Sequence, residues 1–321
     1  MPSDAREPIV ISDLRFGLPY SKGLMAQSFM ATGLSPAKSY EAARAMEQEL
    51  RDNGEFTVSL ERLRDIAAST LSRLAGTQFA VRYRRLEEIG RLDRPLIVLI
   101  GGTTGVGKST VAAEIAHRLG ITRIASTDSI REVMRGIFSR ELMPAIYESS
   151  FNAWRSLRIP VPQGADPVIV GFREQTAVVT TGVKALIDRS VLERVSLVVE
   201  GVHIVPGYIE PSQFKDAVVV QLVITVDDEE AHRSHFYIRE VQTDGNRPFE
   251  KYRENFGDIR VLGHYIEDLA AQHDTPIIHS HQFDRTVSET LEHILSAVMG
   301  ERDATAGRPV ATPRGKGAHT K

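Results

Sequence analysis

The chain has 321 residues, of which 42% are hydrophobic and 25% charged, as in an ordinary globular protein long enough for two domains. It contains no cysteine, which excludes disulfides, thiolate zinc sites and cysteine nucleophiles and fits a reducing cytoplasm. The net charge of −3 provides no general basic field, so nucleic acid is not expected as a main partner. The first residues, MPSDAREPIV, do not resemble a secretory signal, and no apolar run is long enough to span a bilayer. We therefore expect a cytoplasmic protein that makes no membrane contact.

Residues 8–92 predict a small, mainly helical N-terminal domain. Ile9–Ile11 is a candidate short strand. Ser35-Pro36 is predicted to begin a helix that ends at Asn53-Gly54, and Ser59 to begin another.

The segment Leu96–Thr110, LIVLIGGTTGVGKST, contains the G-x-x-x-x-G-K-S pattern of a phosphate-binding loop. The apolar run before the loop is typical of a buried parallel strand, and the four-residue apolar repeat after it predicts a helix. Glycines let backbone N–H groups close around anionic oxygens at the start of that helix. Lys108 can reach the β- and γ-phosphates as a catalytic cation, and the Ser109 hydroxyl can bind Mg²⁺. We therefore predict ATP and Mg²⁺ as cofactors, against the alternative of a chance glycine-rich turn. The predicted nucleotide-binding residues are Gly102, Thr103, Thr104, Gly105, Val106, Gly107, Lys108, Ser109 and Thr110.

Residues 93–300 alternate strand and helix patterns. This alternation predicts an α/β domain, a P-loop NTPase sheet of the kinase type, with parallel strands, helices on both faces and a helical lid. The expected strands are Leu96–Ile100, Arg123–Ala125, Leu197–Val199, Val218–Val226 and Pro276–His279. A final helix is expected at Arg285–Met299, and residues 301–321 are expected to form a disordered tail.

Ligands of an open α/β sheet bind outside the carboxyl ends of its strands. Asp128, just after the second expected strand, has two interpretations: a helix N-cap, or a catalytic carboxylate that accepts the proton of an acceptor hydroxyl. The two roles can coexist. Arg131 and Arg135 are four residues apart and share a helix face, which makes them candidate contacts to an anionic substrate. The alternative is a pair of solvated surface arginines.

Glu200 directly follows the third expected strand and precedes a glycine. Such a carboxylate is placed to hold Mg²⁺ or its water together with Ser109, and it is a candidate catalytic residue; chance placement at a strand end is the alternative. His203 fits a structural role better than a catalytic one. His279 and His281 have no neighbouring carboxylate or cysteine partner and receive no assignment.

Two further segments carry candidate cations. Arg173, in the GFREQ motif, is a candidate substrate contact or a member of a structural ion pair. The segment His232–Tyr265 contains six Lys and Arg residues and predicts a cationic lid that shields the transferring phosphoryl group from water. A solvent-facing charged hairpin is the alternative. Within it, Arg239 is the candidate catalytic cation and Arg247 a candidate substrate contact, although spacing alone does not decide which cations reach phosphate.

Together these motifs resemble the 2-phosphoglycerate kinase family, through GGTTGVGKST, STDSIREVMR, GFREQ, VVEGVHIVPG and HRSHFYIRE…NRPFEKYRENFGDIR. The resemblance covers residues 93–300 and implies transfer of the ATP γ-phosphoryl group to the 3-hydroxyl of 2-phosphoglycerate, giving 2,3-bisphosphoglycerate. It implies that Gly102–Ser109 bind ATP and Mg²⁺ and that Asp128 and Glu200 face the reacting centre. The implied substrate contacts are Arg131, Arg135 and Arg173.

The first domain resembles an ATP-cone-type domain through LPYSKGLMAQSFMATGLSPAKSYEAA. Residues Ser12–Gly17 lack the Lys-Arg pair usual there, so nucleotide binding and a structural role both stay open, with Lys22 as the candidate cation. The phosphate-loop and VVEGVH motifs are shared with uridine kinase and phosphoribulokinase relatives, which leaves a kinase of another small alcohol as an alternative. A nucleotide-sensing regulator is a further alternative, although the arginine-dense lid argues against it. The sequence does not indicate an oligomeric state.

Overall fold

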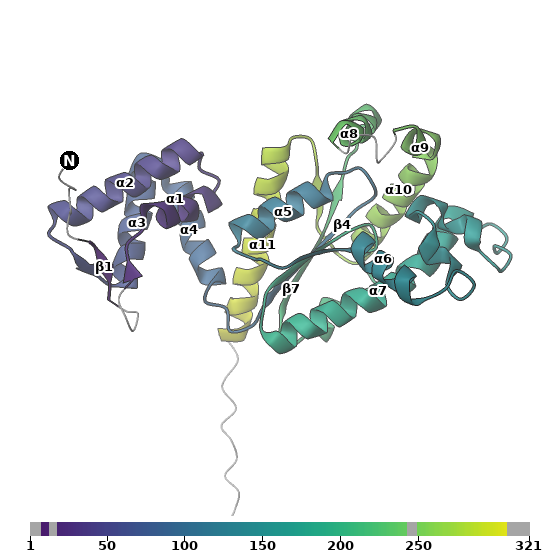
Figure 1. The fold of residues 1–321 in the computed structure, drawn as a ribbon, viewed down its shortest axis with the longest axis horizontal. Coiled ribbons are helices and arrows are strands. Elements are labelled where there is room, and N and C mark those ends of the chain that lie inside the picture. Colours follow the sequence, from purple (N-terminus) through teal and green to yellow (C-terminus); the bar gives the residue numbers. More distant parts are fainter. Residues whose placement is uncertain (1–7, 13–17, 243–248, 307–321) are drawn as a thin grey trace, which may run out of the picture.

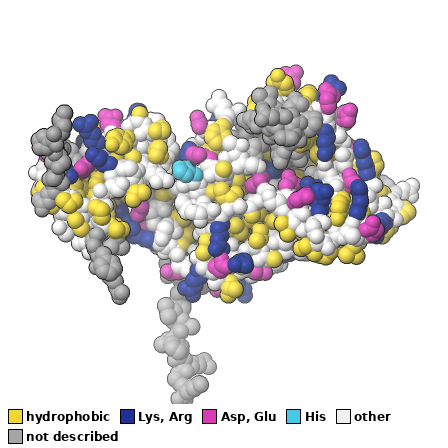
Figure 2. Space-filling model, in the orientation of Figure 1, with side chains coloured by type: hydrophobic (Ala, Val, Ile, Leu, Met, Phe, Trp, Pro, Cys, Tyr) yellow, Lys and Arg dark blue, Asp and Glu magenta, His cyan; other side chains and the backbone are white. Residues whose placement is uncertain are grey.

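The computed structural model describes residues 8–12, 18–242 and 249–306. Figure 1 shows two parts of the molecule, a helical N-terminal part drawn in purple and blue and a larger part built around a central sheet. None of the helices in these ranges combines the length and hydrophobicity needed to cross a membrane. On the face drawn in Figure 2, positive and negative side chains are interspersed rather than gathered by sign.

The N-terminal part combines helices with a small sheet whose strand order is β2-β1-β3. Its elements are β1 (Val10–Ile11), β2 (Leu18–Pro19), α1 (Lys22–Ala31), α2 (Pro36–Asp52), β3 (Thr57–Val58), α3 (Leu60–Leu74) and α4 (Thr77–Ile89). The predicted helix starts are confirmed, because Ser35 and Ser59 are the N-caps of α2 and α3. Ser59 Oγ accepts the N–H of Arg62 at 3.1 Å, which satisfies a donor that the helix itself leaves unpaired. Phe29 and Met46 are fully buried in the core between these helices.

The second part is built on a parallel sheet with the strand order β5-β6-β4-β7-β8. Its strands are β4 (Leu96–Gly101), β5 (Ile124–Ser126), β6 (Leu197–Glu200), β7 (Val218–Thr225) and β8 (Ile277–His279). Each strand predicted from the sequence is confirmed, with small differences at the ends. All carboxyl ends lie at one edge, with β4 in the centre, so the segments that follow these strands converge there.

Helices cover both faces of the sheet, as predicted. The helices of this part are α5 (Lys108–Arg118), α6 (Thr127–Ile137), α7 (Pro167–Glu193), α8 (Glu229–Gln242), α9 (Phe249–Glu254), α10 (Phe256–Gln272) and α11 (Phe283–Ala306). Alternate residues of β4 explain the two layers: Leu96 and Val98 pack in the core with α5 and α11, whereas Ile97 and Leu99 pack with α7. Figure 1 shows α5 and α11 on one side of the sheet and α7 on the other. The unbroken apolar run of β4 is therefore the consequence of burial on both faces.

Three short 3₁₀ helices complete the described elements, namely η1 (Pro144–Tyr147), η2 (Ser150–Ser156) and η3 (Pro211–Gln213). The first two lie in the connection between α6 and α7, residues 138–166, which is named the α6–α7 connection below. In Figure 1, α8 and α9 lie at the carboxyl edge of the sheet, in the segment predicted to form the lid. The last helix, α11, runs past its expected end at Met299 to Ala306, so the first residues of the expected tail are helical. Residues 307–321 lie outside the described part of the chain.

Helix α4 connects the two parts. Ala80 and Tyr83 belong to the N-terminal core, whereas Leu86 and Ile89 pack against the core of the sheet part. Arg82 and Arg85, on the same helix, form ion pairs with Glu292 of α11 at 2.8 and 3.1 Å. One helix thus contributes to both cores. The domain boundary near residue 92 stays a prediction.

Candidate active site

The phosphate loop has the geometry that its glycines permit. Gly105 has φ +91°, and a Cβ atom there would collide with the ring of Phe236 from α8, so only glycine fits. Gly107 is the N-cap of α5, and the loop therefore leads directly into the N-terminus of that helix. Backbone N–H groups at a helix N-terminus form a binding site for phosphate. Thr103 and Val106 turn their side chains into the protein, so their predicted contact with nucleotide is limited to the backbone.

The side chains predicted to act on phosphate and metal lie together beside this loop. Lys108 Nζ donates a hydrogen bond to the Thr103 carbonyl at 2.6 Å, and burial lowers the pKa of this ammonium group from its usual value. Ser109 Oγ donates to Glu200 Oε1 at 3.0 Å. The residues predicted as the magnesium ligands, from α5 and from the end of β6, are thus hydrogen-bonded to one another. A hydroxyl and a carboxylate are hard oxygen donors that suit Mg²⁺ bound together with substrate phosphates.

A cavity of about 820 Å³ opens in front of these residues, within the roughly 300–1,000 Å³ range of small-molecule sites. One wall comes from the phosphate loop and α5, and others come from the start of α6, the α6–α7 connection, the end of β6, the lid and the segment after β8. The lining residues used below are Gly105, Lys108, Ser109, Asp128, Arg131, Ser149, Ser150, Phe151, Glu200, His235, Lys251 and Tyr252. Of the residues predicted to bind substrate or to catalyse, the cavity therefore brings together Lys108, Ser109, Asp128, Arg131 and Glu200.

The N-cap interpretation of Asp128 is wrong. Helix α6 already begins at Thr127, and its N-cap is Ser126, whose Oγ accepts the N–H of Ser129 at 3.0 Å. Asp128 is instead in the first helical turn, with its side chain 59% exposed at the cavity and its carboxylate 3.4 Å from the guanidinium of Arg131. The carboxylate is therefore available to a bound molecule.

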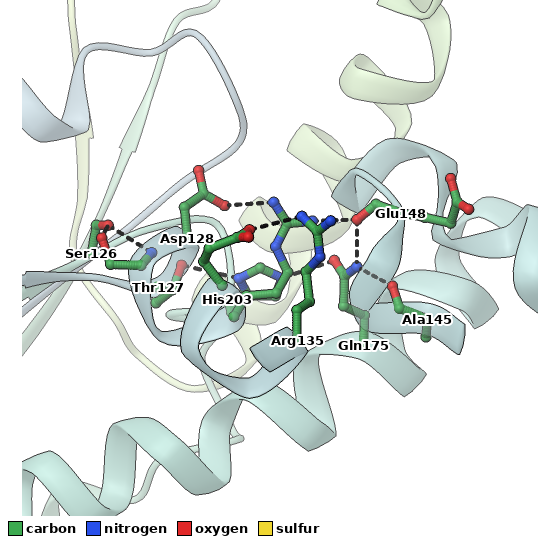
Figure 3. Close-up of polar contacts among 11 residues, drawn as sticks. Ser126, Thr127, Asp128, Arg135, Ala145, Glu148, Gln175 and His203 are labelled. Atoms are coloured by element: carbon green, nitrogen blue, oxygen red, sulfur yellow. Dashed lines mark hydrogen bonds and ion pairs between the residues drawn. The ribbon is translucent and has the colours of Figure 1, made fainter. Parts of the chain in front are cut away.

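A fully buried hydrogen-bond chain lies directly behind Asp128 and is drawn in Figure 3. His203, from the segment after β6, is within 3.0 Å of Thr127 Oγ1 and within 2.8 Å of Gln175 Oε1. Gln175 Nε2 donates to the carbonyls of Ala145 and Glu148 at 2.6 and 3.0 Å. Burial lowers the pKa of His203 to about 3, which keeps the imidazole neutral and agrees with the structural role expected for it.

Arg131 contacts the far end of this hydrogen-bond chain at the Glu148 carbonyl. Its guanidinium donates to the Glu148 carbonyl, the same oxygen that accepts from Gln175. Figure 3 shows the linked residues of this hydrogen-bond chain, Thr127, His203, Gln175, Ala145 and Glu148.

Two other predicted substrate contacts do not line the cavity. Arg135 pairs with Glu132 at 2.7 Å and lies over the ring of Tyr147, 5.1 Å from its centroid. Arg173 is exposed on α7, where a hydrogen bond with Tyr208 raises the pKa of its guanidinium. Of the three arginines only Arg131 lines the cavity, and the roles of Arg135 and Arg173 as substrate contacts stay predictions.

The lid contacts the phosphate loop through histidines that the sequence analysis did not single out. His232 Nε2 donates to the Thr104 carbonyl at 2.7 Å and His235 Nδ1 to the Gly105 carbonyl at 2.9 Å. Burial lowers the pKa of His232 to about 4, so this ring is neutral at pH 7. The H-x-x-H spacing on a helix puts both rings on one face and was the available signal.

The Lys and Arg side chains predicted in the lid differ in where they lie. Lys251 lines the cavity, whereas Arg233 lies 3.8 Å over the ring of Phe256. Arg239 belongs to α8, but its side chain lies outside the described part of the structure, as does all of Arg247. Their predicted roles stay predictions.

The unassigned histidines His279, at the end of β8, and His281, just after it, do not form a metal site. His279 Nδ1 is 2.9 Å from the carboxylate of Asp227, and His281 lines the cavity. Across residues 8–12, 18–242 and 249–306, no cluster of three or more His, Asp or Glu side chains could hold a metal ion. A magnesium site in the described residues therefore rests on Ser109 and Glu200.

Comparisons with known proteins identify the family. The chain is 40% identical over 296 residues to a 2-phosphoglycerate kinase of Methanopyrus kandleri, covering 92% of this chain and 90% of that protein. It is also 40% identical to a 2-phosphoglycerate kinase of Methanothermobacter thermautotrophicus, covering 92% and 96%. No family model matches the chain. A solved shikimate kinase from Acinetobacter baumannii has 18% identity and a TM-score of 0.37 over 65% of this chain and 96% of that one, too weak a likeness to bear on the fold or the substrate. The identity to the two archaeal enzymes extends over nearly the whole of each chain, and the chain therefore belongs to the 2-phosphoglycerate kinase family of phosphotransferases.

Proposed function

We propose that this kinase transfers the γ-phosphoryl group of ATP to the 3-hydroxyl of 2-phosphoglycerate, giving ADP and 2,3-bisphosphoglycerate. The single observation that carries the proposal is the cavity, which is lined both by Lys108 with the Ser109–Glu200 pair and by the Asp128–Arg131 pair. The first set contains groups that suit a nucleotide triphosphate, and the second contains a carboxylate and a guanidinium that suit a phosphorylated hydroxy acid. The family relatives support the same acceptor.

On the donor side, the backbone N–H groups of the phosphate loop bind the β- and γ-phosphates, and Lys108 leaves the Thr103 carbonyl to reach the γ-phosphoryl group. Ser109 and Glu200 would hold Mg²⁺, and the bound ion would neutralise charge on the phosphate oxygens. His232 and His235 hold the loop carbonyls, so the lid keeps the loop in one conformation and excludes water from the transferring group.

On the acceptor side, Asp128 accepts the proton of the 3-hydroxyl as its oxygen attacks phosphorus, and the bond between the γ-phosphorus and the β,γ-bridging oxygen breaks with ADP as the leaving group. Arg131 binds the anionic groups of the acceptor, with the hydroxyls of Ser149 and Ser150 and the ammonium of Lys251 nearby in the cavity lining. Arg239 and Arg247 are further candidates in the lid. The cytoplasmic location and the lack of nucleic-acid binding stay predictions, as does any nucleotide site in the N-terminal domain.

The test is a panel of acceptors. The purified protein is incubated with γ-labelled ATP, Mg²⁺ and, in separate reactions, 2-phosphoglycerate, 3-phosphoglycerate, glycerate, uridine or ribulose 5-phosphate. We expect label in 2,3-bisphosphoglycerate only with 2-phosphoglycerate, in amounts equal to the ADP formed. Label in uridine or ribulose 5-phosphate instead would reject this acceptor while leaving the chemistry of the site intact.

Asp128→Asn tests the proton acceptor, because it keeps the shape of the side chain and removes its charge. We expect kcat to fall by roughly a hundredfold or more. Glu132→Gln, on the exposed side of the same helix, is the matched control and should keep kcat. Full activity of the Asp128→Asn variant would remove Asp128 from the reacting centre.

A further inference from the structure

We propose that Thr127, His203 and Gln175 form a positioning chain that sets the affinity of the enzyme for its acceptor rather than for ATP. The proposal rests on the proposed function of the cavity and assigns a role to three buried residues that touch neither substrate. It unites the STDS, GFREQ and VVEGVH motifs, which are far apart in the sequence and meet in Figure 3.

The hydrogen bonds of the positioning chain have one defined direction. Gln175 uses its amide nitrogen for two backbone carbonyls, so its oxygen is the atom that faces His203. His203 Nε2 must then carry the proton, because two acceptors cannot share a hydrogen bond. A neutral imidazole protonated at Nε2 accepts at Nδ1, and the Thr127 hydroxyl donates to it. Each member of the chain thus has one defined orientation, and no rotamer or ring flip satisfies all the bonds equally well.

At its far end the positioning chain holds the backbone of the α6–α7 connection. Ala145 and Glu148 belong to the α6–α7 connection, immediately before the residues Ser149–Phe151 that line the cavity. The Glu148 carbonyl also accepts from Arg131, so a single oxygen joins the buried chain to the proposed substrate-binding cation. A shift of this carbonyl would therefore move one wall of the acceptor side and the guanidinium together.

At its near end the positioning chain holds the first turn of α6. Thr127 is fully buried in the first turn of α6, next to Asp128. It packs so closely on Gly201 that a Cβ atom at that position would collide with the threonine side chain. The residue after Glu200 must therefore be glycine, and the hydrogen-bond chain is anchored between the proposed proton acceptor and the proposed metal-binding carboxylate. None of these bonds involves the phosphate loop.

This separation predicts a selective effect. Loss of the chain should loosen the acceptor wall while the loop that binds ATP keeps its own contacts. A merely structural role would instead lower stability and the fraction of active enzyme, without changing either KM.

The central experiment uses Gln175→Met, which keeps the volume of the side chain and removes its hydrogen bonds, assayed in the full-length enzyme beside the wild type. We expect the KM for 2-phosphoglycerate to rise about tenfold, the effect of losing buried hydrogen bonds at one site, and the KM for ATP to change less than twofold. The matched control is Thr180→Val. Thr180 is a buried polar residue five positions further along α7 that makes no side-chain hydrogen bond in the described residues, so this variant should keep both constants. An unchanged KM for the acceptor, or an equal rise for ATP, overturns the proposal.

A double mutant tests the shared carbonyl. Because Gln175 and Arg131 act on the same oxygen, Gln175→Met should add less than threefold to the acceptor KM in an Arg131→Gln background, against tenfold alone. Independent, fully multiplying effects would overturn the route through Glu148.

Amide hydrogen exchange tests the positioning chain without requiring turnover of any acceptor. In Gln175→Met, amide hydrogen exchange should accelerate at residues 143–151 and stay unchanged at residues 102–110. Gln175→Asn, which keeps the amide but shortens its reach, replaces the methionine variant if that protein does not fold. If the wild type phosphorylates another acceptor of the panel, the proposed substrate fails while the same KM comparison with that acceptor still tests the chain. Unchanged exchange at residues 143–151 overturns the positioning chain whichever acceptor is used.

Discussion

In the phosphate loop, backbone amides and glycine geometry form the binding surface, whereas the acceptor wall consists of side chains from α6, α7 and the connection between them. The loop is contiguous, from Gly102 to Ser109, and glycine at 105 is required by the packing of α8 against it. The acceptor wall is held by hydrogen bonds between residues such as His203 and Gln175 that are far apart in the chain. Changes in the donor half should therefore act on the rate without unfolding the protein. Changes in the buried hydrogen bonds behind the acceptor wall should act on acceptor affinity and stability together.

The largest effect is expected for Lys108→Met. Loss of the ammonium group removes a charge that stabilises the transferring phosphoryl group, so kcat should fall by about a thousandfold. The melting temperature should stay the same or rise, because burial lowers the pKa of Lys108 and shows that the charged form is costly in the free enzyme. Steady-state kinetics and calorimetry measure the two quantities, with Lys184→Met on α7 as control. A kcat within tenfold of the wild type would contradict the role of Lys108.

Glu200→Gln should come next. A glutamine oxygen still accepts from Ser109 but carries no charge, so the Mg²⁺ concentration needed for half-maximal activity should rise at least about tenfold, with partial recovery at high Mg²⁺. Removing divalent ions from the wild type with a chelator should abolish turnover, and added Mg²⁺ should restore it. Titration of activity against Mg²⁺ measures the shift, with Glu132→Gln as the variant expected to match the wild type. An unchanged Mg²⁺ requirement would place the metal elsewhere.

The same contrast explains what could be predicted from the sequence. The strands and the phosphate loop were predictable because their signals are local: an apolar run, a glycine pattern and a helical repeat in adjacent residues. The N-cap of α6 was not, because Ser126 and Asp128 are both good capping residues and only the start of the helix at Thr127 decides between them. The H-x-x-H spacing of His232 and His235 indicated a shared helix face, but their partners are backbone carbonyls, which the sequence does not identify.

The free energy of unfolding should depend on pH through His203, which lies behind the acceptor wall. Burial lowers the pKa of His203 to about 3 from an ordinary value of 6.5. Between these values the unfolded chain binds a proton that the folded protein does not, so stability falls as pH falls below 6.5, by about 1.4 kcal/mol per pH unit. The loss should reach about 2 kcal/mol at pH 5, whereas above pH 6.5 His203 contributes no slope.

Urea unfolding at pH 7 and pH 5 measures this loss, and His203→Gln, which does not titrate, should reduce it. His232 in the lid contributes in the same direction, since its pKa is also lowered, to about 4, so some acid sensitivity should remain in the variant. An identical pH dependence in the wild type and His203→Gln would show that His203 is not held neutral by burial.

The smallest effect is expected for Arg173→Gln, and it distinguishes the sequence-based assignment from the geometry. Successive residues of an α-helix are about 100° apart, so a side chain two positions from Gln175 points to nearly the opposite side of α7. Phe172 and Gln175 are buried toward the acceptor wall, and Arg173 is consequently exposed beside Tyr208. We expect the KM for 2-phosphoglycerate to change less than twofold in Arg173→Gln, against at least about tenfold in Arg131→Gln, because only Arg131 lines the cavity. Comparable increases in both variants would mean that the acceptor reaches the outer face of α7, and the acceptor wall would then have to be placed there.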